Sequence, residues 1–214
     1  MQGQTQKITA YSYLKEKLLN CEFKPGQYLN EKEIVQSSCF GRTPVREALI
    51  LLQAEKLVEV VPRKGTYARS INRSEVVDMY ELRKLIEPAI IEKYLTNIDL
   101  QKLEILDQKL KETLESEPQD DRKFNELDIA FHRFLASASR CQRIIATLEP
   151  ALQESYRVSM YNNLNGTSNS LERTYQQHHD VVSAIIAENR GRAKEALLVH
   201  LNASLFSSLA SLNT

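Results

Sequence analysis

The chain has 214 residues, with 28 basic residues balanced by 28 acidic ones. This length suits one large domain, or a small domain joined to a larger one. Three scattered cysteines, none in a Cys-x-x-Cys pair, exclude a disulfide framework and a cysteine zinc site. No apolar run reaches the roughly 18 residues of a membrane span, and the first residues lack the apolar core of a signal peptide. We therefore expect a soluble, cytoplasmic protein with no membrane partner.

Charge is distributed unevenly along the chain. Residues 1–70 carry 11 Lys+Arg and 7 Asp+Glu, a net charge of +4, and the remaining residues carry 17 and 21, a net charge of −4. A basic front and an acidic rear are typical of a nucleic-acid-binding head on a separate sensor or assembly domain. The alternative at this stage is a chance asymmetry on solvated faces.

The first 70 residues predict three helices followed by a hairpin. Apolar residues at helical spacing end near Asn20, where a Pro-Gly turn interrupts them, and Asn30 is a suitable N-cap for a short second helix that ends near Ser38. Pro44 fits only the first turn of a helix, so a third helix begins near residues 41–43. Its buried face consists of Val45, Ala48, Leu49 and Leu52. The segment "LVEVVPRKGTYA" then predicts two strands and a basic turn, which completes a winged helix-turn-helix.

The basic residues of this region suit DNA. Arg42, Thr43 and Arg46 stand at the N-terminal end of the third helix, which can enter the major groove. Arginine there pairs with guanine or neutralises phosphate, whereas the alternative is an ordinary solvated helix face. The turn between the strands, formed by Arg63, Lys64 and Gly65, would lie against the DNA backbone or the minor groove.

Four motifs carry a resemblance to a known family: Pro-Gly-x-x-Leu, Arg-Thr-Pro-Val-Arg-Glu-Ala-Leu, Glu-x-Leu-Val and the Arg-x-Gly tip. Together they resemble the DNA-binding domain of bacterial transcription regulators of the GntR family over its full length. The resemblance implies that Lys32, Arg42, Thr43, Arg46 and Gly65 contact double-stranded operator DNA. The chain departs from the family in having glycine before Arg42, where Ser or Thr is common, and Lys32 where Arg is frequent.

The remaining chain has helical periodicity throughout. We expect a linker at 71–75 and an all-helical domain at 76–214, folded as an antiparallel bundle. The fold class is therefore mainly α, a winged helix-turn-helix followed by a helical bundle. The expected helices span residues 74–96, 99–117, 120–139, 142–161, 168–189 and 192–211.

Three histidines and one aspartate of the rear domain are predicted to converge. Asp128 and His132 lie one turn apart in an apolar stripe, and His178 falls on the inward face of a later helix. A helix break near 190–191 lies about midway between His178 and His200, so two antiparallel arms bring them to the same level. The set suits a divalent transition metal, which could be zinc, nickel, manganese or iron. For each histidine alone, a hydrogen-bonded core imidazole is the alternative.

The rear domain resembles the all-helical FCD ligand-binding domain of the FadR subgroup. An Asp-x-x-Phe-His block ends at His132, a His-x-x block begins at His178, and a final His-Leu pair begins at His200. The resemblance implies that Asp128, His132, His178 and His200 are metal ligands and that Arg83 points toward the effector. A surface or interhelix salt bridge is the alternative role of Arg83. Two further effector-binding candidates are Tyr156 and Arg157.

These features predict a repressor, not an enzyme. We expect a homodimer whose affinity for operator DNA depends on a small organic acid bound at the metal. Two alternatives stay open: a metal-dependent hydrolase that uses the same four ligands, and a regulator whose metal is purely structural.

Overall fold

The computed structural model describes residues 2–166, 170–210 and 212, and side chains from residue 8 onward. The chain divides into two compact units, residues 1–72 and 73–214, which are described separately. In the described residues three quarters of the chain is helical and the only sheet has two strands. The predicted mainly α fold class is confirmed.

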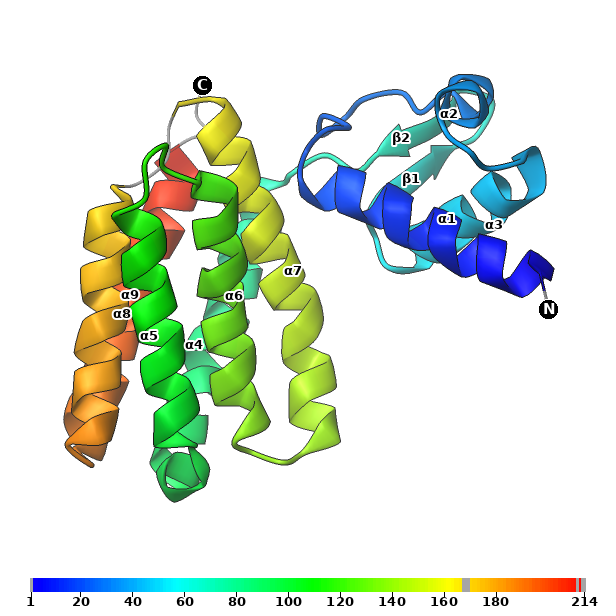
Figure 1. Cartoon of the computed structure of the whole chain (residues 1–214). Helices are drawn as coiled ribbons and strands as arrows, with labels where there is room; N and C mark the ends of the chain where they lie inside the picture. Colours follow the sequence, from blue (N-terminus) through cyan, green and yellow to red (C-terminus); the bar gives the residue numbers. More distant parts are fainter. Residues whose placement is uncertain (1, 167–169, 211, 213–214) are drawn as a thin grey trace. The chain divides into compact units, whose positions relative to one another are not determined.

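The first unit contains three helices and a hairpin (Figure 1). Their order is α1 (Gln2–Leu19), α2 (Glu31–Ser37), α3 (Arg42–Ala54), β1 (Val58–Val61) and β2 (Gly65–Ala68). The strands are antiparallel, and Val61 pairs with Gly65 at the turn. This is the predicted winged helix-turn-helix, in which α3 is the helix expected to enter DNA.

Local chemistry explains how α2 and α3 begin. The Asn30 side chain accepts a hydrogen bond from the Lys32 amide, as a good N-cap does. Gly41 precedes α3 without a side-chain cap. The apolar face of α3 is buried as predicted, because it packs on α1 and on the hairpin. The core of this unit includes Leu14, Leu18, Ile34, Val45, Ala48, Leu49, Leu52, Leu57 and Val58.

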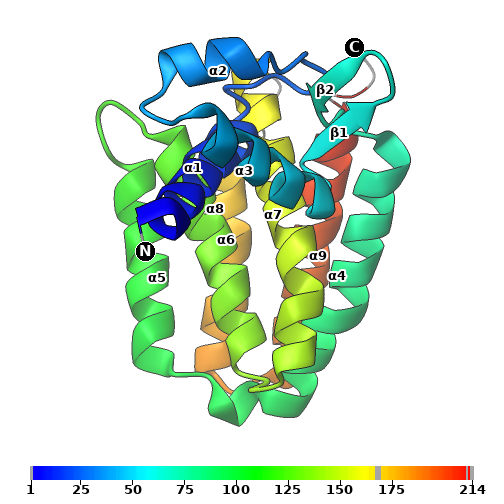
Figure 2. The same ribbon diagram turned by 90° about the vertical axis from the view of Figure 1, so that its right-hand side faces the viewer.

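The second unit is a ring of six long helices that lie side by side (Figures 1 and 2). They are α4 (Arg73–Tyr94), α5 (Leu100–Leu114), α6 (Asp121–Ser137), α7 (Gln142–Leu164), α8 (Leu171–Ile186) and α9 (Arg190–Ala210), with a 3-10 turn at Leu95–Asn97. Each helix contacts the next in the order α4, α9, α8, α5, α6, α7, and α7 contacts α4 again. The ring therefore closes around an interior that every helix can line.

Some predicted helix ends were wrong. Helix α5 ends at Leu114 instead of 117, and α7 continues to Leu164, three residues beyond the predicted end. The break before α9 lies at 187–189, because Asn189 accepts a hydrogen bond from the Arg192 amide and so starts the helix before the glycine. The predicted start at 168 and the predicted end at 211 lie outside the described residues.

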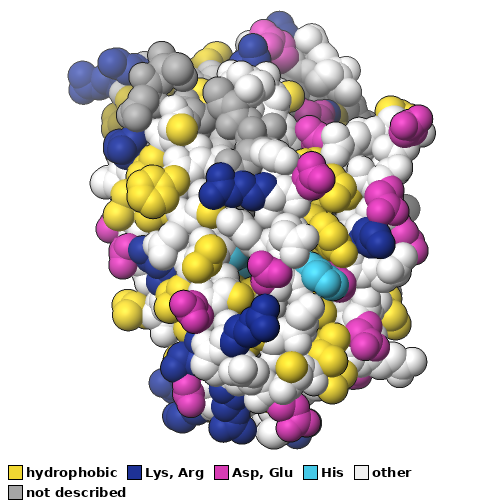
Figure 3. Space-filling model, turned by 90° about the vertical axis from the view of Figure 1, so that its left-hand side faces the viewer, with side chains coloured by type: hydrophobic (Ala, Val, Ile, Leu, Met, Phe, Trp, Pro, Cys, Tyr) yellow, Lys and Arg dark blue, Asp and Glu magenta, His cyan; other side chains and the backbone are white. Residues whose placement is uncertain are grey.

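The interior of the ring is not wholly apolar. Most buried side chains are hydrocarbon, but six large polar residues are at most 1% exposed: Arg83, Glu87, His132, Arg157, His178 and His200. Buried polar groups are costly unless they are paired, so their concentration indicates a site. The face drawn in Figure 3 carries interspersed acidic and basic side chains. None of the helices formed by the described residues has the length and hydropathy needed to span a lipid bilayer.

Candidate DNA-binding surface and metal centre

A concave surface on the first unit collects four of the seven predicted DNA-binding residues. Lys32 from α2, Arg42 and Arg46 from α3, and Gly65 from β2 line it together. All three cationic side chains are exposed. Such a surface offers positive charge from two helices beside a wing, which suits the phosphates of a duplex.

The other three candidates lie outside this hollow. Thr43 is exposed near the start of α3, and Arg63 and Lys64 form the exposed tip of the hairpin, with Arg63 at a φ of +63°. An acidic neighbour also appears that sequence reasoning missed. The Glu31 carboxylate lies 3.5 Å from Arg46 Nε, and both side chains are more than one third exposed. This contact orients Arg46 more than it stabilises the fold, because exposed ion pairs contribute little.

Gly65 has two structural reasons to be glycine. Its φ is +112°, and a Cβ atom at this position would lie 2.5 Å from Cε2 of Tyr28. The Tyr28 ring packs edge-on against Tyr67, with ring centroids 5.4 Å apart, and Tyr28 also lines the concave surface. Tyr28 therefore supports the wing from outside the hairpin, a role that sequence reasoning did not assign.

The four residues predicted as metal ligands meet inside the second unit. Asp128 and His132 come from α6, His178 from α8 and His200 from α9, and one ligand atom of each lies within 4.8 Å of all the others. The Nε2 atom of His200 is 3.1 Å from Nε2 of His132 and 3.2 Å from Nε2 of His178. Asp128 Oδ1 is 3.1 Å from His178 Nε2.

These distances fit a single bound ion. Donor atoms about 2.0–2.2 Å from a transition metal lie about 2.8–3.6 Å apart when neighbouring ligands stand at octahedral or tetrahedral angles. Direct hydrogen bonds satisfy the cluster only in part, because His200 Nε2 is shared between two imidazoles and the Nδ1 atoms of His178 and His200 have no partner among the described residues. Three imidazoles and one carboxylate form a donor set that zinc, nickel, manganese and iron accept.

A buried carboxylate that sequence reasoning did not place holds this cluster. Glu87 of α4 accepts from His132 Nδ1 at 2.6 Å through Oε2 and from Arg83 Nε at 2.6 Å through Oε1. When the proton of His132 is on Nδ1, Nε2 keeps a free lone pair, which points toward the other ligands. The only signal in the sequence is the spacing of four residues between Arg83 and Glu87, which does not show that His132 is the third partner.

The protonation states follow from burial and neighbouring charge. Burial lowers the pKa of His132 and lowers the pKa of His200 further, helped by the adjacent imidazoles, so the neutral metal-binding forms dominate near pH 7. Burial opposes ionisation of Glu87, but Arg83 and His132 lower its pKa to about 2. Burial likewise opposes ionisation of Asp128, yet His178 and the other imidazoles hold its pKa well below the usual range.

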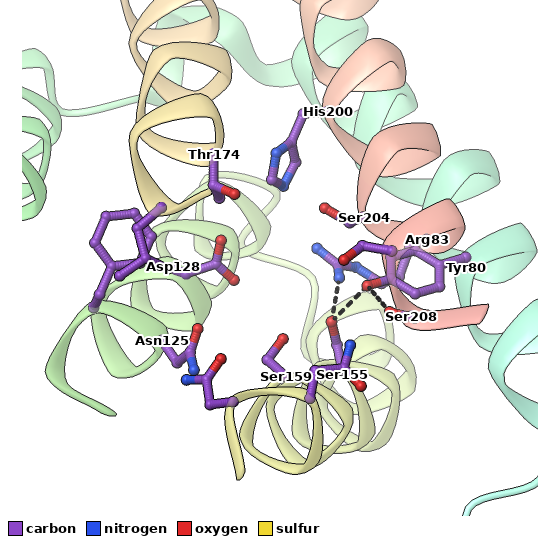
Figure 4. Close-up of a pocket in the computed structure, with 15 residues that line it drawn as sticks. Tyr80, Arg83, Asn125, Asp128, Ser155, Ser159, Thr174, His200, Ser204 and Ser208 are labelled. Atoms are coloured by element: carbon purple, nitrogen blue, oxygen red, sulfur yellow. Dashed lines mark hydrogen bonds between the residues drawn. The ribbon is translucent and has the colours of Figure 1, made fainter. Parts of the chain in front are cut away.

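A polar pocket opens beside the cluster (Figure 4). Arg83, Asp128 and His200 line it, and its cavity volume is about 50 Å³. Arg83 donates from Nη1 to Ser155 Oγ at 2.8 Å, while its buried Nη2 has no partner among the described residues. Arg83 pairs with Glu87 within α4, in a buried ion pair four residues apart, so its salt bridge is neither at the surface nor between helices.

The other two effector candidates are not placed in this pocket. Arg157 is fully buried with Nη1 3.6 Å from the Glu154 carboxylate, and Tyr156 is half-buried, but neither lines the pocket. The fourth histidine, His179, is also separate, since its Nδ1 lies 2.9 Å from Asp107 on the outer side of the ring. The structure thus gathers Arg83 with the four predicted ligands and leaves Tyr156 and Arg157 apart.

A winged helix-turn-helix with a basic concave surface, joined to a helical domain with an internal polar site, is the architecture of a DNA-binding transcription regulator. The family models agree: residues 6–68 match "Bacterial regulatory proteins, gntR family" and residues 78–203 match "FCD domain". The chain therefore belongs to the GntR family of bacterial transcription regulators and carries an FCD domain.

Individual relatives are similar along most of the chain. The HTH-type transcriptional repressor RspR of Escherichia coli is 30% identical over 196 residues, which are 89% of this chain and 83% of RspR. The structure of E. coli McbR/YncC aligns with a TM-score of 0.82 and 18% identity, covering 97% of this chain and 98% of that one. The structure titled "Metal-free FCD domain of TM0439 a putative transcriptional regulator" aligns at 0.59 and 19%, covering 67% and 98%. The structural matches show a shared fold.

Proposed function

We propose that this regulator is a homodimeric repressor whose affinity for its operator is set by a small organic acid bound at a metal centre in the FCD domain. The observation that carries the proposal is the juxtaposition of a four-ligand cluster with a pocket that contains an unpaired guanidinium nitrogen. A metal ion and an arginine beside an open pocket together recognise a carboxylate.

Asp128, His132, His178 and His200 would hold the metal, and Glu87 would fix the tautomer and orientation of His132. When bound, the ion supplies a Lewis-acidic attachment point for an anionic ligand. The three imidazoles come from three different helices, so the ion would also tie α6, α8 and α9 together. Removal of the metal should therefore loosen the ring as well as weaken ligand binding.

Arg83 would bind the carboxylate of the effector. Its Nε and Nη1 atoms are held by Glu87 and Ser155, so the guanidinium is fixed in place before a ligand arrives. Preorganised donors bind more tightly because less side-chain entropy is lost on binding. The remaining Nη2 atom is buried, and a carboxylate oxygen would satisfy it.

The position of Arg83 suggests how the signal leaves the domain. Helix α4 carries both Arg83 and Glu87, and only residues 69–72 separate it from the last strand of the wing. A ligand that binds one position of α4 better than another would shift the population of head arrangements. Release of DNA on ligand binding is the proposed response. The name of the relative RspR supports only the part of the proposal that makes this protein a repressor.

The dimer belongs to the proposal for a physical reason. One recognition helix reads only a short half-site, and two heads related by a twofold axis read a palindrome. The names of the relatives as transcription regulators favour this function over the hydrolase alternative.

The decisive experiment compares the metal-loaded full-length protein with chelated protein. Operator affinity is measured by fluorescence anisotropy while short organic acids are titrated, and the visible spectrum of the cobalt-substituted protein reports whether the acid reaches the metal. We expect the acid to weaken DNA binding and to change the cobalt spectrum, and His178→Ala to abolish both effects. If chelation lowers the melting temperature but no acid changes DNA binding or the spectrum, the metal is structural and the proposal is wrong.

A further inference from the structure

An acidic side chain lies within the concave basic surface of the first unit. Glu31, the first residue of α2, lines this surface together with the cationic side chains of Lys32, Arg42 and Arg46. A carboxylate repels the phosphates that these cations attract, so it weakens contact with the DNA backbone. The hydrogen-bond donors of a duplex lie on the edges of its bases, and only there does a carboxylate gain a favourable contact.

The cap of α2 does not use Glu31. The Asn30 side chain accepts from the Lys32 amide, and its Nδ2 atom donates to Glu33 Oε1 at 2.8 Å. Among the described residues the ion partner of Glu31 is Arg46, with Oε2 3.5 Å from Nε. The side chains of Arg46 and Glu31 are 66% and 39% exposed, so the pair is accessible to a duplex that enters the concave surface.

The pair offers a donor and an acceptor next to each other. Glu31 lies beside the Nε atom of Arg46, and the terminal nitrogens of Arg46 have no hydrogen-bond partner among the described residues. Arginine donates to two acceptors at once through its planar group, and a carboxylate accepts. A base pair that matches both residues must therefore present two acceptors followed by a donor.

Only a G·C base pair has this order in the major groove. Guanine presents the acceptors N7 and O6, and the paired cytosine presents its N4 amino group as a donor next to O6. Guanine O6 and cytosine N4 are joined by a Watson–Crick hydrogen bond, so they lie roughly 2.9 Å apart. The 3.5 Å between the paired atoms of Arg46 and Glu31 is close to this spacing.

We infer that Glu31 reads a base: Arg46 donates to O6 and N7 of a guanine, and Glu31 accepts from N4 of the cytosine paired with it. At an A·T pair in the same orientation, thymine O4 would face the carboxylate and adenine N6 would face the guanidinium, and both contacts would be repulsive. The inference rests on the DNA-binding part of the proposed function and adds a residue to its seven predicted contacts.

The test locates this base pair with modified nucleotides. Full-length protein first selects a preferred duplex from a randomised library, and its affinity is measured by fluorescence anisotropy. Each cytosine is then replaced by N4-methylcytosine, whose methyl group takes the place of the amino hydrogen in the major groove, and each guanine by 7-deazaguanine, which lacks the N7 acceptor. We expect one G·C pair in each half-site at which either replacement weakens binding at least tenfold.

Variants of the two residues separate their roles. Glu31→Ala should reduce the penalty of N4-methylcytosine at that pair to less than twofold and keep most of the penalty of 7-deazaguanine, whereas Arg46→Ala should lose the penalty of 7-deazaguanine. The readout is the ratio between duplexes, because loss of a carboxylate from this surface tightens binding to every duplex.

Glu22→Ala is the matched control. Its carboxylate pairs with Lys17 in the same unit and does not line the concave surface, so this variant should keep both penalties. Circular dichroism shows that each variant is folded, which we expect because Glu31 and Arg46 are exposed.

Each contrary result has a distinct meaning. An equal penalty of N4-methylcytosine in Glu31→Ala and the wild type overturns the inference and leaves operator binding intact. Loss of both penalties in Glu31→Ala means that Glu31 only orients Arg46, and this also overturns it. Penalties at different base pairs refute the reading of one G·C pair by both residues. If the protein binds DNA but selects no preferred duplex, the operator binding of the proposed function fails as well.

Discussion

Replacing Glu87 by glutamine tests whether this buried carboxylate organises the metal centre. Glu87 is 1% exposed and accepts hydrogen bonds from His132 Nδ1 and Arg83 Nε, each at 2.6 Å. Its pKa of about 2 means that it is an anion at neutral pH. Glutamine has nearly the same shape, but it removes the charge and presents an amide donor to one of two partners that are themselves donors.

The expected loss has two parts. Removing one partner of a buried ion pair costs about 3–5 kcal/mol, and glutamine retains one acceptor, so we expect about 3 kcal/mol. In a domain of this size that corresponds to a fall in melting temperature of roughly 6–12 °C. Loss of an outer carboxylate also lowers metal affinity about 10–100-fold, because the imidazole loses its orientation and the site gains a positive charge.

The assay measures zinc affinity by competition with a chromophoric chelator and stability by thermal unfolding of the zinc-loaded and chelated forms. Glu92→Gln is the matched control, because Glu92 lies on the same helix and pairs with Lys194 at an exposed position. We expect that variant to keep the zinc affinity of the wild type. If Glu87→Gln also binds zinc as tightly as the wild type, the proposed support of His132 by Glu87 is refuted.

Four further predictions concern the first unit. Arg46→Ala should weaken operator binding by about 1–3 kcal/mol and relax sequence preference if Arg46 reads a base; a uniform loss across sequences in anisotropy titrations would make it a phosphate contact. Glu31→Gln removes the carboxylate beside Arg46 and should tighten binding to any duplex a fewfold in the same assay, while unchanged affinity would show that the pair dissolves on DNA. Gly65→Ala should strain the wing by about 1–3 kcal/mol and weaken operator binding, and adding Tyr28→Ala should recover part of the lost affinity by removing the clash with the Tyr28 ring. If Gly65→Ala binds the operator as tightly as the wild type, Gly65 is not needed for the shape of the wing. Leu52→Ala should destabilise the head by about 2–5 kcal/mol, measured by urea unfolding of the isolated head against the wild-type head, because Leu52 is fully buried.

The prediction of the first unit succeeded because its signals are local. The phase of the apolar residues in α3 and the place of Pro44 set where the helix begins and which face is buried. The exact ends of the helices in the second unit were harder to predict, because a capping residue and a nearby glycine or proline can each end or begin a helix. At the start of α9, the Asn189 cap prevailed over the glycine two residues later.

The metal ligands could be proposed from the sequence because helical spacing puts Asp128 and His132 on one face and antiparallel arms bring His178 to the level of His200. Glu87 could not be assigned, since periodicity shows which face of α4 is inward but not which side chain it meets across the ring. Periodicity likewise could not show what Tyr156 and Arg157 contact. Both lie on α7, a helix that lines the pocket, but neither side chain lines the pocket itself.

The two-part architecture, the basic N-terminal end of α3 and the inward direction of the ligand-bearing faces could all be predicted from the residues alone, because each depends on neighbours within a few turns of the chain. Which polar groups share the interior became known from the folded arrangement of the helices. Ser159, Ser204 and Arg83 are far apart in the sequence and line one pocket because α7, α9 and α4 are adjacent in the closed ring. The order of helices around that ring depends on how whole faces pack together, which short-range patterns do not encode.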